Sequence, residues 1–136
     1  MILFDQRDGM LTLTFPSRLR HDEFKIGLQR LMETCNDVDL QGGKLVIIAD
    51  VRVAEVPSAT ERRLVGEAIR ANDNCLRRIL CGWAVVTDSL LHRGVITAIS
   101  WISPSPCPLS TFSSVSRAEA WAQRQLSGVG SSSSSS

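Results

Sequence analysis

The segment KLVIIADVRVAEVPSATERRL, Lys44 to Leu64, carries the clearest structural pattern in the chain. An unbroken apolar run, Leu45–Ala49, stops at Asp50, and such a run favours a strand that is covered on both faces, as in a parallel sheet. Ser58 and Glu61 then have the spacing of a capping box, which predicts the start of a helix. A strand, a loop and a helix N-terminus together make a suitable place for a ligand, a phosphate or a protein partner.

The rest of the chain shows the same alternation of strand and helix patterns. The predicted elements are two strands within residues 2–15 with a turn at Gly9, a helix from about Asp22 to Asn36, a loop from Asp37 to Gly43, the strand Leu45–Ala49, a helix from Ala59 to about Leu80, a strand at Cys81–Val86, a helix from Asp88 or Ser89 to about Ile102, a strand at Leu109–Phe112 and a last helix opened by a capping box at Ser116 and Glu119. The order β-β-α-β-α-β-α-β-α predicts an α/β domain whose mixed, mostly parallel sheet has helices packed against it.

Length and composition indicate one domain. The chain has 136 residues and a formal net charge of +1, so residues 1–127 are expected to form the domain, and the Ser-rich residues 128–136 are expected to be disordered. The charge gives no reason to expect nucleic-acid binding. No apolar stretch is long enough to span a bilayer, and the first residues do not resemble a signal peptide. We therefore expect a cytoplasmic protein.

Four cysteines are scattered along the chain without the paired spacing of a metal site. They are Cys35, Cys75, Cys81 and Cys107. Most fall at predicted core positions, so we interpret them as small buried apolar residues. No metal and no cofactor is predicted.

Three features of the sequence are grounds for a family resemblance: the element order with its Asp-terminated strand and Pro-Ser-Ala-Thr-Glu helix start, the hydrophobic segment LHRGVITAISWI (Leu91–Ile102), and the pattern of residues 112–121. The first resembles the STAS domain of anti-sigma-factor antagonists. The other two are similar to the hydrophobic third helix and the ending of the divergent STAS-like relatives of that domain. The resemblance covers residues 1 to about 126. It implies a STAS-like fold and a non-enzymatic role in bacterial-type signalling, through binding of a protein partner or a second copy of the chain.

The start of the predicted second helix is a candidate phosphorylation site. In the family that the chain resembles, an Asp-Ser-Ser/Thr-Gly sequence begins this helix and its first Ser is phosphorylated. Here the matching residues are Pro-Ser-Ala-Thr-Glu, which makes Ser58 and Thr60 the candidate phosphoacceptors. A phosphate there would meet free N–H groups and the side chain of Arg62 or Arg63. We favour the interpretation of Ser58 as a helix cap, because the capping box already accounts for it.

A second group of polar residues is expected at the carboxyl edge of the sheet. Asp50 and Asp88 each follow a predicted parallel strand, and ligands bind at this edge in open α/β sheets. Arg52, His92 and Arg93 can join them to form a ligand rim, or a site for acid–base chemistry. We favour the simpler interpretation, in which Asp50 is a turn residue, Asp88 is a cap and Arg93 is their ion-pair partner.

The predicted third helix is apolar on nearly every side. Surface helices normally carry one apolar stripe, so part of this helix must be covered by the following loop or by a partner. We expect a partner contact centred on Leu91, Val95, Ile99 and Ile102, with Arg93 at its rim and with Arg62 and Arg63 of the second helix nearby.

Three functional hypotheses follow, in this order. The first is a non-enzymatic protein-interaction module that uses the second and third helices. The second is a module that binds a small ligand or lipid in a groove beside the third helix. The third is an enzyme that uses Asp50, Asp88 and His92. A partner module requires an exposed apolar patch and no deep pocket. A ligand binder requires a cavity under residues 91–102, and an enzyme requires the two carboxylates and His92 within hydrogen-bond reach.

Overall fold

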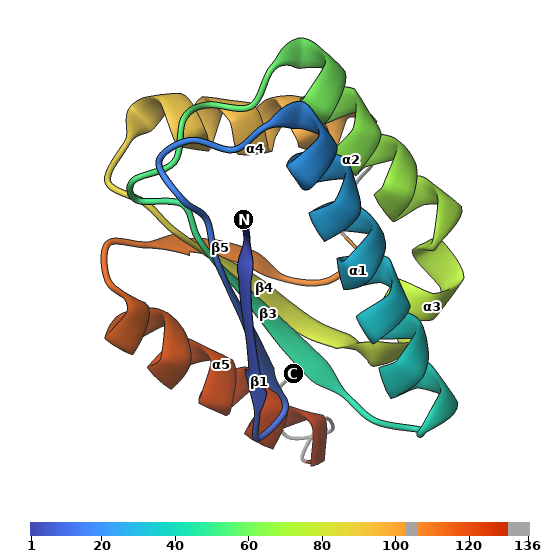
Figure 1. Cartoon of the computed structure of the whole chain (residues 1–136). Coiled ribbons are helices and arrows are strands. Elements are labelled where there is room, and N and C mark those ends of the chain that lie inside the picture. Colours follow the sequence, from blue (N-terminus) through green and yellow to red (C-terminus); the bar gives the residue numbers. More distant parts are fainter. Residues whose placement is uncertain (103–105, 131–136) are drawn as a thin grey trace.

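The structure is a computed structural model that describes the backbone of residues 1–102 and 106–130 and the side chains of residues 1–97 and 106–128. The chain alternates strands and helices, as its periodicity predicts (Figure 1). The described elements are β1 (Leu3–Arg7), β2 (Met10–Thr14), α1 (His21–Leu40), β3 (Leu45–Asp50), α2 (Ala59–Ala71), α3 (Asp73–Ile79), β4 (Leu80–Val86), α4 (Leu90–Ile102), β5 (Leu109–Phe112) and α5 (Val115–Gly130). The α/β fold class is therefore confirmed.

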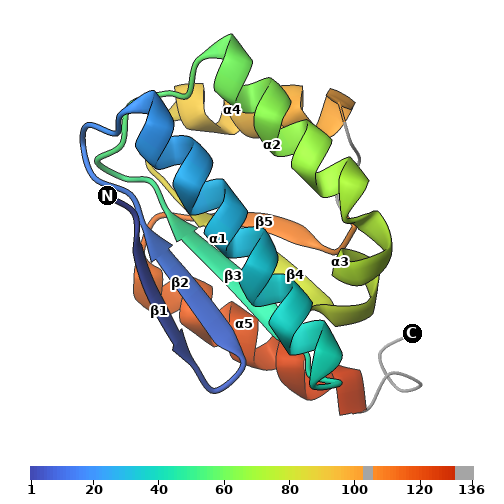
Figure 2. The ribbon, with the colours of Figure 1, turned by 45° about the vertical axis from the view of Figure 1, so that its right-hand side comes forward.

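The strands form one five-stranded sheet in the order β1-β2-β3-β4-β5 (Figure 2). β1 is antiparallel to β2, and every later pair is parallel. Asp8 and Gly9, between β1 and β2, both have positive φ, which is the conformation of a tight hairpin turn. β3 and β4 are parallel neighbours in the sheet.

Helices cover both faces of the sheet. α1, α2 and α3 pack on one face, α5 packs on the other, and α4 lies against α2 (Figure 1). Alternate residues of β3 point to opposite faces of the sheet. Leu45 and Ile47 belong to the core under α1 and α3, whereas Val46 and Ile48 belong to the core under α5. This two-sided burial is the reason that β3 is apolar at almost every position.

The predicted boundaries of the first and second helices are wrong. The second helix is interrupted at Asn72, whose side-chain amide donates to the carbonyl of Ala68 at 2.8 Å and thereby competes with the backbone for that acceptor. The first helix continues to Leu40, where a loop was predicted. It ends in a Schellman motif, in which Gly42 has positive φ and the Gly43 amide donates to the carbonyl of Val38 at 2.9 Å.

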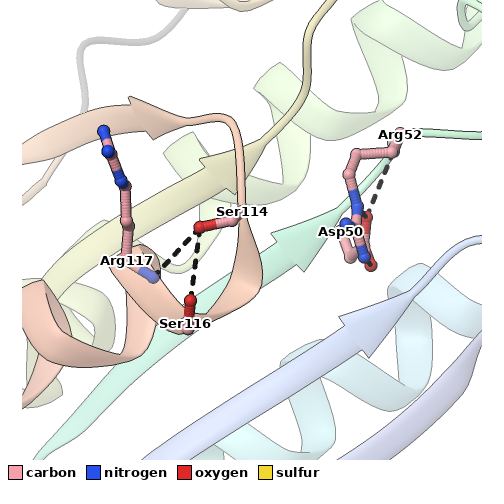
Figure 3. Close-up of polar contacts among 5 residues, drawn as sticks. All are labelled: Asp50, Arg52, Ser114, Ser116 and Arg117. Atoms are coloured by element: carbon pink, nitrogen blue, oxygen red, sulfur yellow. Dashed lines mark hydrogen bonds and ion pairs between the residues drawn. The ribbon is translucent and has the colours of Figure 1, made fainter.

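The predicted capping box of the last helix is also displaced. α5 begins at Val115, and its first turn is capped by Ser114, whose Oγ accepts from the Arg117 amide at 3.3 Å (Figure 3). Ser116 therefore lies inside the helix. α5 extends to Gly130, past the boundary expected from composition, and residues 131–136 lie outside the described residues. None of the described helices is long and apolar enough to cross a membrane.

Candidate functional site

A cavity of about 220 Å³ lies on the face of the sheet that α1 and α2 cover, near the carboxyl ends of the parallel strands. It is partly open to solvent, and α1, α2, α4 and the β3–α2 loop contribute its walls. Ligands of open α/β sheets bind at this end. The lining residues are Ile2, Phe4, Leu13, Phe15, Pro16, Leu19, Phe24, Gly27, Leu28, Leu31, Met32, Ala49, Val51, Ala54, Glu55, Val56, Pro57, Glu61, Val65, Ile69, Trp83, Val85, His92, Val95 and Ile96.

One row of side chains across the sheet forms the floor. Ala49 is paired with Leu13 of β2 on one side and with Val85 of β4 on the other. Ala49 is much smaller than Leu45 and Ile47, which precede it on the same face of β3. A short side chain at this position leaves unfilled space next to Val85, and the cavity occupies that space.

The walls are mainly apolar and carry little charge. Among the described lining residues the carboxylates are Glu55 and Glu61, and none is Lys or Arg. Glu61 is already engaged: one carboxylate oxygen accepts from the Ser58 amide at 3.0 Å, and the other lies 3.4 Å from Nδ1 of His21. The cavity therefore suits an apolar molecule that meets a few polar atoms.

His92 is the most buried polar residue among the described side chains of α4. It is 7% exposed, and its Nδ1 lies 3.2 Å from Oγ1 of the fully buried Thr87. Ser89 holds the start of this helix, since its Oγ accepts from the Leu91 and His92 amides at 3.1 and 3.4 Å. Ser89 is thus one of the two caps that the sequence offered. The other ring nitrogen of His92, Nε2, is buried and has no hydrogen-bond partner among the described residues.

Trp83 contributes a second polar atom of the same kind. It lies on β4, between Ile47 of β3 and Leu109 of β5, and it lines the cavity. Its Nε1 is buried and, within the described part of the chain, has no acceptor. Buried polar atoms nearly always have a partner, so these two nitrogens are exceptions within the described part of the core.

Asp50 and Arg52 form a closed pair at the end of β3. Arg52 donates to both carboxylate oxygens of Asp50, at 3.0 and 2.9 Å (Figure 3). These bonds lower the pKa of Asp50 below its ordinary value, against the opposing effect of burial. Arg93 was the predicted ion-pair partner of Asp50. That prediction is wrong, because Arg52, only two residues away, donates to both carboxylate oxygens. Asp50 is the last residue of β3, and its Oδ1 also accepts from the Arg52 amide at 3.2 Å, so it ends the strand where a turn residue was predicted.

The other members of the predicted rim do not meet. Asp88 is exposed. Asp50 is the main cause of the raised pKa of Arg52, and the nearby charge of Asp88 raises it further. Asp88 does not cap α4. Among the described residues, no hydrogen bond or ion pair joins His92 to Asp50 or Asp88. The structure thus separates the closed Asp50–Arg52 ion pair at the edge of the sheet from the imidazole of His92, which lines the cavity.

The start of α2 has the predicted cap. The Glu61 amide donates to Oγ of Ser58 at 3.1 Å, and the Glu61 carboxylate accepts the Ser58 amide, which completes the capping box. Arg62 donates to the carbonyl of Pro57 at 2.9 Å, while Arg63 and Thr60 are exposed. The two arginines therefore lie at this helix start in different environments.

The predicted partner contact on α4 divides between two sides of the helix. Leu91 is 71% exposed, as is the preceding Leu90 at 79%, and Arg93 is also exposed. Val95 is half-buried and lines the cavity. The side chains of Ile99 and Ile102 lie outside the described residues.

The cysteines are free thiols, and two of them, Cys35 and Cys75, are buried as predicted. Burial raises the pKa of Cys35 to about 12, so it stays a thiol at neutral pH and is a poor nucleophile. Cys81 and Cys107 are half-buried. Within the described residues, no group of three or more His, Cys, Asp or Glu side chains is arranged to hold a metal ion.

Sequence reasoning did not identify Ala49, Trp83 or Thr87 as parts of a site. A weak signal exists for Trp83, because a single large aromatic residue with a polar atom interrupts a strand of small apolar residues. Thr87 carries a signal too: it lies two residues before the helix cap, at a position where a hydroxyl often accepts a backbone amide. Ala49 gives none, since alanine is common in strands that are covered on both faces.

The resemblance to STAS-like proteins rests on sequence pattern, and its implications for function stay predictions. No protein-family model matches this chain, and no curated protein matches it either.

Proposed function

We propose that this domain binds a small, mainly apolar molecule in the cavity beneath α4. The observation that carries the proposal is the cavity itself, which His92, Val95 and Ile96 of α4 line from one side. A cavity at this place is the feature that distinguishes a ligand binder from a partner module. The order of the two leading hypotheses is therefore the reverse of that favoured by the sequence.

The size of the cavity limits the ligand. An engineered apolar cavity of about 150 Å³ in another protein holds benzene, so about 220 Å³ accommodates roughly nine non-hydrogen atoms. Pockets for drug-sized ligands begin at about 300 Å³. The proposed ligand is accordingly a small aromatic or branched aliphatic molecule, or one end of a longer chain that leaves through the open side.

Filling the cavity tests this proposal. Ala49→Leu places extra carbon atoms on the floor, and we expect it to weaken binding of toluene, followed by NMR titration, by at least about tenfold while the fold is kept. Ala59→Leu is the matched control, because Ala59 is exposed at the start of α2 and does not line the cavity. Failure of toluene to bind the wild type near its solubility limit, or equal binding by Ala49→Leu, would show that the cavity is not a binding site.

A second candidate function is supported by a different surface. Leu90 and Leu91 are adjacent, strongly exposed leucines at the start of α4, and exposed apolar side chains next to a charged rim are typical of protein contacts. We propose that a protein partner, or a second copy of the chain, docks there, as the STAS-like resemblance implies. Arg93, Arg62 and Arg63 are the charged residues proposed for the rim.

The proposal is a non-enzymatic one. Asp50 is tied to Arg52 by two hydrogen bonds, and His92 contacts Thr87 inside the domain. A reaction that used both carboxylates and His92 would need them around one reacting group, and no contact between described residues supports that arrangement.

A further inference from the structure

We propose that the chain forms a two-fold symmetric homodimer through the start of α4. In this dimer Leu90 of each copy packs against Leu91 of the other, and Asp88 of each copy pairs with Arg93 of the other. The inference rests on the second candidate function, because it names the partner of the Leu90–Leu91 surface. It does not involve the cavity, so it can fail while the proposed ligand site holds.

The exposed apolar surface at this place is not confined to α4. Leu90 and Leu91 are strongly exposed, and Val53 of the β3–α2 loop is 66% exposed. This loop begins beside the end of β4, because the Val51 amide donates to the Val86 carbonyl at 3.0 Å. It passes the start of α4 in both views of the ribbon (Figures 1 and 2). Several large apolar side chains exposed at one end of a sheet are typical of a surface that another molecule covers.

Two exposed side chains of opposite charge flank the two leucines. Asp88 stands two residues before the first leucine, and Arg93 stands two residues after the second. Within the described part of the chain, no ion pair joins these two side chains to each other. The nearby Arg52 feels the charge of Asp88 but is already paired with Asp50. The rim of the surface therefore offers a carboxylate and a guanidinium to a partner.

This arrangement is self-complementary about a two-fold axis. In a two-fold contact each pair of touching residues occurs twice, once in each direction. When two helix starts meet in antiparallel directions with the axis between Leu90 and Leu91, each leucine faces the other leucine of the second copy. Positions equally far from the axis also face each other, which brings Asp88 against Arg93 of the second copy at both ends of the contact. The chain thus supplies its own complement, apolar and charged, and this favours a second copy over an unrelated protein.

Charge reversal followed by mixing tests this arrangement. Arg93→Glu alone and Asp88→Arg alone each place like charges opposite one another at two points of the dimer. We expect the Kd of self-association, measured by sedimentation equilibrium, to rise at least about tenfold in each variant. In an equimolar mixture of the two variants, the heterodimer has opposite charges at both points, so its Kd should return to within about threefold of the wild-type value. Damage to the fold of either chain could not be repaired by mixing.

Two charge reversals on α1 are the matched controls. Glu33 and Lys25 are exposed and lie outside the proposed contact, so Glu33→Arg and Lys25→Glu should leave the Kd unchanged. Circular dichroism checks that every variant keeps the wild-type fold. A measurement on the wild type needs no variant: in a mixture of isotope-labelled and unlabelled protein, isotope-filtered NOEs should join the methyl groups of Leu90 and Leu91 across the two copies.

Three outcomes overturn the inference, and they separate it from the function on which it rests. If the wild type is monomeric up to about 1 mM protein while Leu91→Glu abolishes capture of another protein, the surface has a different partner and only this inference fails. If Leu91→Glu breaks the dimer but mixing does not rescue the charge reversals, a second copy covers the leucines in another arrangement, and again only the inference fails. If the dimer persists in a folded Leu91→Glu variant, the inference and the second candidate function fail together.

Discussion

Ser58 shows at the scale of one residue how a short motif is used. Its hydroxyl and the Glu61 carboxylate each satisfy a backbone amide at the start of α2. A Ser in this role is needed for its oxygen, and Asp supplies an equivalent acceptor. Glu61 also lines the cavity, so the cap also holds a residue at the proposed ligand site.

Replacement of Ser58 distinguishes a cap from a phosphoacceptor. Ser58→Ala should lower the free energy of unfolding by about 0.5–2 kcal/mol, measured by urea denaturation, whereas Ser58→Asp should be nearly neutral for stability and for partner binding. The opposite finding would be stoichiometric phosphate on Ser58 in cells, detected by mass spectrometry, together with loss of binding in the Asp variant.

The pair of Asp50 and Arg52 predicts a pH dependence of stability. The folded-state pKa of Asp50 is lowered, so its contribution is present above the unfolded pKa of about 4 and is lost as the pH falls through the folded pKa. Asp50→Asn should reduce the free energy of unfolding by about 1–2 kcal/mol at pH 7, a small value because Arg52 is partly exposed. The difference from the wild type should shrink below about pH 4.

Asp5→Asn is the control for this measurement. Asp5 pairs with Arg7 on the surface, where both side chains are more than half exposed, and such pairs contribute little. Equal pH profiles for Asp50→Asn and the wild type would contradict the assigned role of the Asp50–Arg52 pair.

At the scale of elements, α4 has two sides with different surroundings. His92, Val95 and Ile96 line the cavity, while Leu90, Leu91 and Arg93 face solvent. The mainly apolar character of this helix is therefore explained in part by the cavity. The exposure of Leu90 and Leu91 to solvent is not explained by packing within the fold.

Leu91→Glu tests the partner surface. An added charge at a mainly exposed position should leave the melting temperature unchanged and should break association, because interface centres tolerate charge poorly. Sedimentation and pull-down measure the effect, with Thr97→Glu, at an exposed position of the same helix, as the control. Association that persists in a folded Leu91→Glu variant would remove the proposed surface. Ile99 was also predicted to contribute, and its side chain lies outside the described residues.

The contact between α5 and β4 depends on a glycine. An added Cβ at Gly82 would lie 2.6 Å from Cη2 of Trp121, and the Trp121 ring also packs against Phe112, with centroids 5.6 Å apart. Gly82→Ala should therefore lower the free energy of unfolding by about 1–3 kcal/mol, measured by urea denaturation. Gly94→Ala, where an added Cβ meets nothing within 4 Å, should be neutral or stabilising. Equal stabilities of the two variants would contradict this packing.

At the scale of the whole molecule, the central strand β3 contributes residues to the cores on both faces of the sheet. Ile47 is 1% exposed and is paired with Leu11 on one side and Trp83 on the other. Ile47→Asp should unfold the domain, because an unpaired buried charge costs several kcal/mol against a total stability of about 5–15 kcal/mol. Circular dichroism checks this, and Ile26→Asp, at a 64% exposed position of α1, is the control. A cooperative melt at the wild-type temperature for Ile47→Asp would contradict the position of β3.

The sequence alone determined the features that depend on residues a few positions apart. The apolar run of β3, the capping box at Ser58 and the alternation in β2 identify the element order, and this order leads to a mostly parallel α/β sheet. Two predicted helix boundaries were wrong because another nearby polar side chain bonds to the backbone. The Asn72 amide bonds to the Ala68 carbonyl where the second helix is interrupted, and Ser114, not Ser116, caps α5.

The tertiary structure alone decided the candidate site. Its floor comes from three strands, at Leu13, Ala49 and Val85, and no periodic pattern relates these positions. The same is true of the buried nitrogens of Trp83 and His92 that have no partner among the described residues, because that property depends on all the groups that pack around each atom. Local patterns encode which element forms and which face is apolar, whereas a cavity is the volume left between elements, and that volume is set only when all of them have packed.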